Sequence, residues 1–278
     1  MKPRKLLVHS GGVGDFLCTL PALAQWQPTA HIEVAGIPER AALAQAAGLA
    51  NGVHDLERIG FHSAFSTPNE TLREFARRFD GAWVCMEDSD STLTRNLIDA
   101  GIPEVQCFPG IPPEGWNQHA AHWYAQALGV SVRLPVHFDF GPADEGFEVV
   151  IAPGSGGAAK NWPMENFQWV ARQLESEGHH VSWCGGPAES EWPLPGPQLP
   201  ETPLALLAPR LARSRLFIGN DSGITHLAAV ARCATVAVFG PTNPVVWGPM
   251  GPQVAVLQEP PWPDRTVVLE TARRFLGA

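Results

Sequence analysis

The chain has 278 residues, of which 45% are hydrophobic and 17% charged, enough for one large domain or two ordinary ones. Its formal net charge of -9 argues against non-specific binding to nucleic acid or to an anionic membrane, because such binding needs clustered cations. The five cysteines are scattered and form no C-x-x-C pair, which argues against both a disulfide framework and a zinc knuckle.

The first half of the chain alternates short apolar runs with segments of helical period. Strands are expected at 5–10, 31–37, 53–56, 81–86 and 105–108. Helices are expected at 15–26, 39–50, 70–79 and 91–101, with a further helix late in 111–130. This β-α-β order predicts a parallel sheet with helices on both faces, which is a Rossmann-like domain.

The polar segment GPADEG at 141–146 is the best linker candidate, and the same rhythm restarts after it. Strands are expected at 147–153, 179–186, 215–220 and 235–240, and helices at 164–178, 204–214, 222–232 and 265–276. The prediction is an α/β protein with domains at 1–143 and 144–278, two Rossmann-like halves with a cleft between them.

The first chemistry-bearing stretch is 10-SGGVGDFLCTLPAL-23, where a strand leads through small residues into a helix. Gly11, Gly12 and Gly14 let backbone N–H groups approach an anion or a sugar hydroxyl closely. Asp15 stands at the helix start, where a carboxylate either caps the helix or takes part in catalysis. The spacing alone leaves both interpretations open.

A second glycine-rich loop, 153-PGSGGAAKNWP-163, also follows a strand and precedes a helix. It offers the Ser155 hydroxyl and Lys160, one of only three lysines in the chain. The loop lacks the G-K-[ST] ending of a P-loop, which disfavours ATP hydrolysis. We expect it to bind the phosphate of a nucleotide or nucleotide-sugar; the alternative is an ordinary turn with a solvated lysine.

The third stretch is 219-GNDSGITHLAAVARCATVAVFGPTNPVVWGP-249. Asp221 and Ser222 stand at a helix N-terminus, Gly223 permits close backbone approach, and His226 lies one turn into the helix. Such an end suits a diphosphate and its sugar. The alternative is a simple N-cap with a buried, hydrogen-bonded histidine.

No metal site is expected. The triplet 88-DSD-90 imitates the metal-binding D-x-D of some glycosyltransferases, but it precedes a helix-like segment for which Asp90 or Ser91 is most simply the N-cap. The sequence shows no other ligand set of the kind that holds zinc.

At these three stretches the chain resembles glycosyltransferase family 9, the ADP-heptose:lipopolysaccharide heptosyltransferases. The first stretch is similar to the family's glycine-aspartate opening, the second to its proline-glycine-to-lysine-tryptophan-proline loop, and the third to its longest signature. The matches occur in the same order and span most of the chain, so together they are far more specific than any one motif.

The resemblance implies a GT-B fold with an N-terminal acceptor domain, a C-terminal donor domain, and a last helix that packs back on the N-terminal domain. It implies an inverting transfer without a metal, with Asp15 as the general base and a loop of Gly11, Gly12 and Gly14 for acceptor or diphosphate. The implied donor-binding residues are Ser155, Lys160, Glu189 or Glu191, Asp221, Ser222, Gly223 and His226, of which the glutamates would bind the ribose.

The expected ligands are a nucleotide-sugar co-substrate, ADP-heptose, and a glycan or glycolipid acceptor, with no bound cofactor. A monomeric, cytoplasmic protein with at most peripheral membrane contact is expected, since the sequence shows no apolar run of membrane-spanning length. Two alternatives stay open, a nucleotide-sugar epimerase of the same architecture and a non-catalytic nucleotide-sugar-binding protein. A dinucleotide-dependent oxidoreductase is disfavoured because neither glycine loop has the required spacing.

Overall fold

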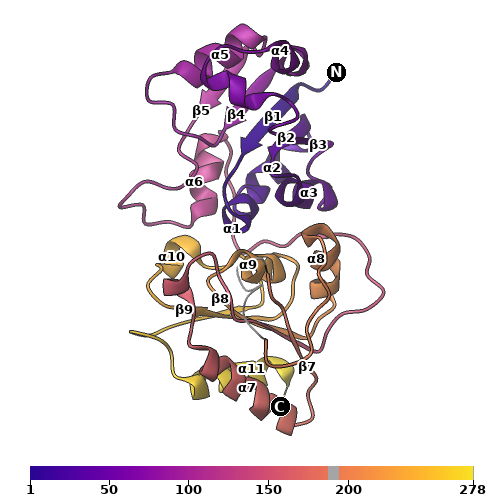
Figure 1. Cartoon of the computed structure of the whole chain (residues 1–278), viewed down its shortest axis with the longest axis vertical. Coiled ribbons are helices and arrows are strands. Elements are labelled where there is room, and N and C mark those ends of the chain that lie inside the picture. The colour runs from indigo at the N-terminus through magenta and orange to yellow at the C-terminus, as the bar shows by residue number, and fades with distance from the viewer. Residues whose placement is uncertain (187–193, 278) are drawn as a thin grey trace. The chain divides into compact units, whose positions relative to one another are not determined.

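A computed structural model describes residues 1–186 and 194–277. The chain divides into two compact units, Met1–Arg133 and Leu134–Ala278, each built on its own five-stranded parallel sheet (Figure 1). The α/β fold class with two Rossmann-like domains is therefore confirmed.

The division lies ten residues before the expected boundary at 143. Backbone hydrogen bonds account for this difference. The N–H of Val136 donates to the carbonyl of Met250, and the N–H of Phe138 donates to that of Val230. The segment that follows Arg133 is therefore tied to the second unit before the polar GPADEG segment begins.

The first unit has the strand order β3-β2-β1-β4-β5, and every neighbouring pair is parallel. Its strands are β1 (Arg4–His9), β2 (His31–Gly36), β3 (Gly52–Asp55), β4 (Gly81–Val84) and β5 (Glu104–Cys107). Its helices are α1 (Val13–Leu17), α2 (Leu20–Trp26), α3 (Pro38–Ala46), η1 (Phe61–Phe65), α4 (Glu70–Ala76), α5 (Thr92–Ala100) and α6 (Ala120–Ala127).

Side chains of β1 alternate between the two faces of this sheet, as a strand requires. Leu6 and Val8 enter a core formed with η1, α4 and α5. His9 lies on the other face, where its ring contacts Phe16 of α1 and Tyr124 of α6. The buried sheet positions explain why the strands read as continuous apolar runs.

The single helix expected at 15–26 is two helices, α1 and α2. Thr19 is the N-cap of α2, and Pro21 occupies one of its first two positions, where a missing N–H costs no helical hydrogen bond. The proline therefore starts a new helix instead of continuing the first.

The second unit has the strand order β10-β9-β8-β6-β7, again all parallel. Its strands are β6 (Val149–Ala152), β7 (Val181–Trp183), β8 (Leu216–Asn220), β9 (Thr235–Phe239) and β10 (Val254–Gln258). Its helices are η2 (Ala158–Lys160), α7 (Met164–Ser176), α8 (Leu204–Ala212), α9 (Gly223–Val230), α10 (Pro244–Trp247) and α11 (Arg265–Leu276). Strand β10 and helix α10 were not predicted from the sequence.

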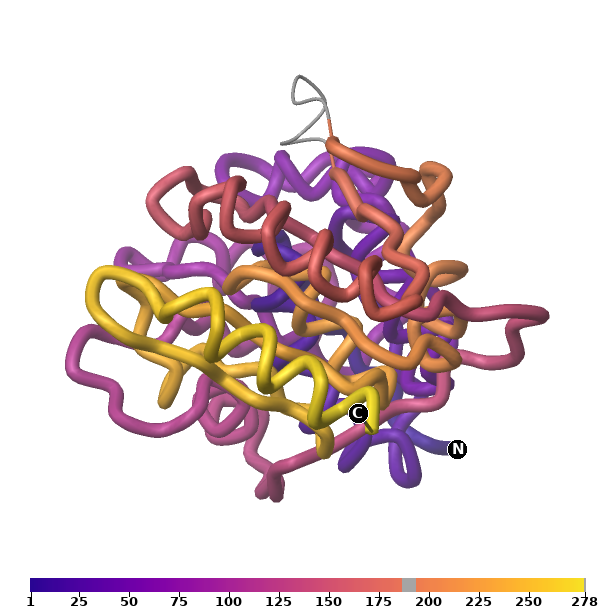
Figure 2. The backbone as a smooth tube through the Cα atoms, turned by 90° about the horizontal axis from the view of Figure 1, so that it is seen from below, coloured from indigo at the N-terminus to yellow at the C-terminus, as the bar shows by residue number. Residues whose placement is uncertain are grey.

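Helices α7 and α11 cover one face of this sheet, and α8 and α9 cover the other (Figure 1). The family resemblance implies a last helix that packs back on the N-terminal domain. In the structure α11 runs beside α7 (Figure 2), and its buried side chains Val268, Leu269, Ala272 and Leu276 belong to the core of the second unit. The apolar face of this helix is thus already used within its own unit. Among the helices of the described residues, none has the length and hydropathy needed to cross a membrane.

Candidate active site

The strand orders locate a candidate ligand-binding position in each unit. In an open parallel sheet, ligands bind outside the carboxyl ends of the strands, where the strand order reverses. The first sheet reverses between β1 and β4, and the loop leaving β1 carries Gly11, Gly12 and Asp15. The second reverses between β6 and β8, and the loops leaving these two strands carry Lys160 and Asp221. All three predicted stretches therefore stand at switch points.

Asp15 caps the start of α1. Its Oδ2 accepts a hydrogen bond from the Gly12 N–H at 2.9 Å, so the carboxylate at the third helical position reaches back to the N-cap backbone. Oδ1 accepts no hydrogen bond from any residue that the structure describes. The side chain is half-buried. One carboxylate oxygen thus fixes the loop while the other stays available, so capping and a catalytic role are compatible.

The glycine loop of the first unit is also held by Arg40, which sequence reasoning did not single out. This side chain comes from α3 and donates from Nη1 to the Gly11 carbonyl oxygen at 2.6 Å. Nothing in the local sequence around Arg40 signals this contact, because the two residues are 29 positions apart and meet only through the fold.

In the second unit, the predicted lysine and aspartate form an ion pair. Lys160 Nζ lies 2.8 Å from Asp221 Oδ2, and the carboxylate is buried whereas the lysine is 42% exposed. His226 Nε2 lies 3.8 Å from Asp221 Oδ1, and this histidine is also buried. Burial by itself raises the pKa of the Asp221 carboxyl, but the His226 and Lys160 side chains outweigh it and hold that pKa below its ordinary value.

Asn220 joins the two loops that carry this group. It is fully buried at the end of β8. Its Oδ1 accepts from the Trp162 N–H at 3.0 Å, and its Nδ2 donates to the Pro153 carbonyl at 2.6 Å. In the sequence, Asn220 was predicted only to end a strand. A polar residue at the end of a buried apolar strand could have indicated this role, because a buried amide needs hydrogen-bond partners nearby.

The two predicted serines have local partners. Ser155 Oγ donates to Asn161 Oδ1 at 2.6 Å and also lies 2.9 Å from the Gly157 carbonyl oxygen, so it shapes the β6 loop from within. Ser222 is the N-cap of α9, and its Oγ lies 3.0 Å from Thr225 Oγ1. Gly223 is the first residue of α9, as the resemblance predicts for a helix end that receives phosphate.

Two groups of sequence candidates need separate mention. Glu189 and Glu191, proposed for the ribose, lie outside the described residues. Asp88 and Asp90 both accept hydrogen bonds from N–H groups in the first turn of α5, so the capping interpretation of the DSD triplet is confirmed. Within residues 1–186 and 194–277, no three His, Cys, Asp or Glu side chains come together as a metal site would require.

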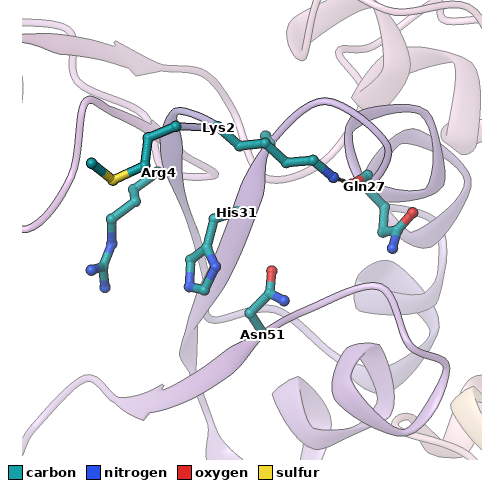
Figure 3. A pocket seen from close by; sticks show the side chains of 7 residues that line it. Lys2, Arg4, Gln27, His31 and Asn51 are labelled. Carbon is teal, nitrogen blue, oxygen red and sulfur yellow. Dashed lines mark hydrogen bonds between the residues drawn. The ribbon is translucent and has the colours of Figure 1, made fainter.

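A pocket of about 310 Å³ lies at the opposite, amino edge of the first sheet (Figure 3). It is lined by Met1, Lys2, Arg4, Gln27, Ala30, His31 and Asn51. Several of these side chains already bind within the unit: Lys2 donates to the Gln27 carbonyl, and Asn51 accepts from the Ile32 N–H. The pocket contains none of the predicted site residues, and it lies at the strand ends away from the switch point.

Comparison with known proteins shows to which family the chain belongs. Residues 44–272 match the family described as glycosyltransferase family 9 (heptosyltransferase), a match over most of the chain. The chain belongs to glycosyltransferase family 9. This confirms the family resemblance that the three sequence stretches indicated.

Curated relatives match parts of the chain. Lipopolysaccharide heptosyltransferase 1 of Pseudomonas aeruginosa is 30% identical over 159 residues, which are 50% of this chain and 44% of the relative. Lipooligosaccharide heptosyltransferase 2 of Campylobacter jejuni is 36% identical over 107 residues, 34% of this chain and 33% of the relative. The chain thus spans less than half the length of these two curated relatives.

Solved structures match the whole fold. E. coli heptosyltransferase WaaC with ADP superimposes with a TM-score of 0.73 at 20% identity, covering 98% of this chain and 99% of that one. E. coli ADP-heptose lps heptosyltransferase II superimposes with a TM-score of 0.76 at 20% identity, covering 99% and 98%. At this identity the likeness shows the shared fold, and it confirms the predicted GT-B architecture for this family 9 chain.

Proposed function

We propose that this chain transfers a sugar, heptose, from ADP-heptose to lipopolysaccharide or another cell-surface glycan, with inversion and without a metal ion. The observation that carries the proposal is the Lys160–Asp221 pair at the switch point of the second sheet. The names of the relatives support it, as does the solved E. coli heptosyltransferase with ADP-2-deoxy-2-fluoro heptose.

The donor half of the mechanism follows from charge. A nucleoside diphosphate leaving group gains negative charge as its bond to the anomeric carbon breaks. Lys160, 42% exposed, has an ammonium that can reach an incoming phosphate, and the N-terminus of α9 adds its free N–H groups and dipole. These groups take the role that a divalent cation has in metal-dependent transferases. Asp221 keeps the ammonium positioned before the donor binds.

The acceptor half depends on Asp15. In the proposed reaction, its carboxylate takes the proton of the acceptor hydroxyl while that oxygen forms a bond to the anomeric carbon. The oxygen attacks the face opposite the departing diphosphate, so the configuration inverts and ADP leaves with the electron pair. Gly12 orients the carboxylate through Oδ2, which leaves Oδ1 to receive the proton. The reaction would take place in the cytoplasm, at the inner face of the membrane that holds the acceptor.

A transfer assay tests this function. The protein is incubated with ADP-heptose and heptose-deficient lipopolysaccharide in EDTA, and both ADP release and the mass of the glycolipid are followed. The proposal expects acceptor-dependent ADP release with a mass gain of one heptose. Donor turnover at the same rate without acceptor would contradict it and would favour an epimerase or hydrolase.

A further inference from the structure

His9 is a buried polar residue with no polar partner. It is the last residue of β1, directly before the glycine loop, and only 3% of its surface is exposed. Neither ring nitrogen forms a hydrogen bond within the part of the chain that the structure describes. Buried polar side chains are nearly always hydrogen-bonded, so an orphaned imidazole at the end of a switch-point strand calls for an explanation.

The ring lies against the same glycine as the Asp15 carboxylate. A Cβ placed on Gly11 would stand 2.9 Å from His9 Cε1, 3.3 Å from His9 Nε2 and 3.3 Å from Asp15 Oδ2. A side chain at position 11 would therefore have to displace the His9 ring or the Asp15 carboxylate. His9 Nε2, which has no partner among the described residues, and the Asp15 carboxylate therefore both lie beside Gly11.

The His9 ring packs against two buried aromatic side chains, whereas the glycine loop beside it is more exposed. Phe16 and Tyr124 contact the ring and are themselves buried. The hydroxyl of Tyr124 is already used, since it donates to the Gly110 carbonyl at 2.5 Å. In contrast, loop residues 11–15 are half-buried, so the loop side faces solvent. A small backbone movement at Gly11 would open Nε2 to a hydroxyl.

We propose that His9 is a further polar residue of the acceptor site, whose Nε2 hydrogen-bonds the acceptor sugar that Asp15 deprotonates. This inference rests on the proposed transferase function and names one more residue of the same site. The ligand class is a polyhydroxylated sugar, because an imidazole offers either an N–H donor or a lone pair to a hydroxyl.

Burial and a neighbouring cation keep the His9 ring neutral. Burial, together with the Arg40 guanidinium, lowers the pKa of His9 to about 4. Arg40 donates to the Gly11 carbonyl on the same loop, and Asp15 is the acidic group beside Gly11. A neutral imidazole can therefore hydrogen-bond a sugar hydroxyl without forming an ion pair with the Asp15 carboxylate.

The test compares His9→Phe and His9→Gln with wild type, and uses His62→Phe at an exposed position of η1 as the matched control. Each protein is assayed for thermal stability, ADP affinity, and kcat and KM for heptose-deficient lipopolysaccharide with ADP-heptose. We expect His9→Phe to keep ADP affinity within about twofold and to lower kcat/KM for the acceptor at least about tenfold. His9→Gln, which restores a polar group, should recover part of that loss.

Other outcomes separate the two proposals. If wild type transfers heptose and His9→Phe does so equally well, His9 only packs and this inference is overturned while the transferase function stands. If wild type transfers nothing, the function itself fails, and the inference fails with it. Should His9→Phe not fold, His9→Leu takes its place, since wild-type kcat/KM in a folded apolar variant would overturn the proposal.

Discussion

Lys160 Nζ lies 2.8 Å from Asp221 Oδ2, although the two residues are 61 positions apart in the chain. The pair joins the loop that leaves β6 to the loop that leaves β8, at the point where the strand order reverses. An ion pair with one buried partner is weak evidence for stability, because burying the carboxylate offsets much of the attraction. Under the proposed function, the pair instead positions the Lys160 ammonium for an incoming diphosphate.

Substitution of Asp15 separates its two roles. Asp15→Asn keeps an oxygen that can accept the Gly12 N–H but cannot take a proton, whereas Asp15→Ala loses both functions. We expect either change to lower kcat for transfer by about 10² to 10⁴, the usual contribution of a general base, and to leave donor affinity nearly unchanged. Steady-state kinetics and ADP titration measure the two effects.

The two variants should differ in stability, although both lose activity. Asp15→Asn is expected to unfold in urea like wild type, while Asp15→Ala loses about 1 kcal/mol through the missing cap. Full transfer activity in Asp15→Asn would show that the carboxylate caps the helix and is not the base.

The glycine loop of the first unit tolerates no side chain at position 11. Gly11→Ala would place a methyl group 2.9 Å from the His9 ring, so we expect a loss of about 1–3 kcal/mol in unfolding free energy and reduced transfer. Gly156→Ala is the control, because a Cβ there meets nothing within 4 Å. It should stay within about 0.5 kcal/mol of wild type. Equal stability of the two variants in urea unfolding would show that the loop at Gly11 is not tightly packed.

Asn220 should matter for both stability and donor binding. Asn220→Ala leaves the Trp162 N–H and the Pro153 carbonyl buried without their partner, which we expect to cost about 3 kcal/mol. It also releases the loop that carries Lys160, so ADP affinity should fall. Asn69→Ala, which removes the N-cap of α4, is the comparison and should cost only about 1 kcal/mol without changing ADP affinity. Unchanged ADP affinity in a folded Asn220→Ala protein would mean that the loop holds its shape without this residue.

We expect the stability of the first unit to fall on acidification because of Glu33 in β2. It is 3% exposed and accepts hydrogen bonds from Arg4, from Arg78 at 2.9 Å and from His54 at 2.6 Å. Burial by itself raises the pKa of Glu33, but the hydrogen bonds from His54 and Arg4 hold it below the ordinary value. Its contribution is therefore fully present above the unfolded pKa of about 4.3 and is lost as the pH falls below that value.

The corresponding variant is Glu33→Gln. Since Arg4 and Arg78 are partly exposed, we expect it to cost about 1–3 kcal/mol near neutral pH and to lose less stability than wild type on acidification. Glu70→Gln breaks an exposed ion pair with Arg77 and should have no measurable effect. Urea unfolding between about pH 6 and 3 measures both; parallel pH curves for wild type and Glu33→Gln would contradict the assignment.

The sequence predicted the fold class well because strands such as β4, β6, β8 and β9 are fully buried and read as continuous apolar runs. It failed where a signal was weak or non-local. Strand β10 (Val254–Gln258) was missed although VAVL is apolar; it is a short, half-exposed edge strand between two proline-containing loops. The contacts of Arg40 with Gly11 and of Asn220 with Trp162 join distant segments, and only the fold brings them together.

The predicted site residues were found by a different kind of signal. Glycines, an acid and a lysine directly after apolar runs indicate backbone exposed at the ends of parallel strands, which is where such sheets bind ligands. This signal located Asp15, Lys160 and Asp221. It missed His9, because a histidine inside an apolar run reads as an ordinary core residue.

The central claim is that the second unit binds an ADP donor through Lys160 without a metal. Isothermal titration of ADP and ADP-heptose in EDTA, with wild type, Lys160→Ala and the control Lys2→Ala from the amino edge of the first sheet, tests it most directly. We predict binding in EDTA that Lys160→Ala weakens about ten- to hundredfold and Lys2→Ala leaves unchanged. Equal affinity of Lys160→Ala and wild type, or binding that appears only when magnesium is added, would contradict it.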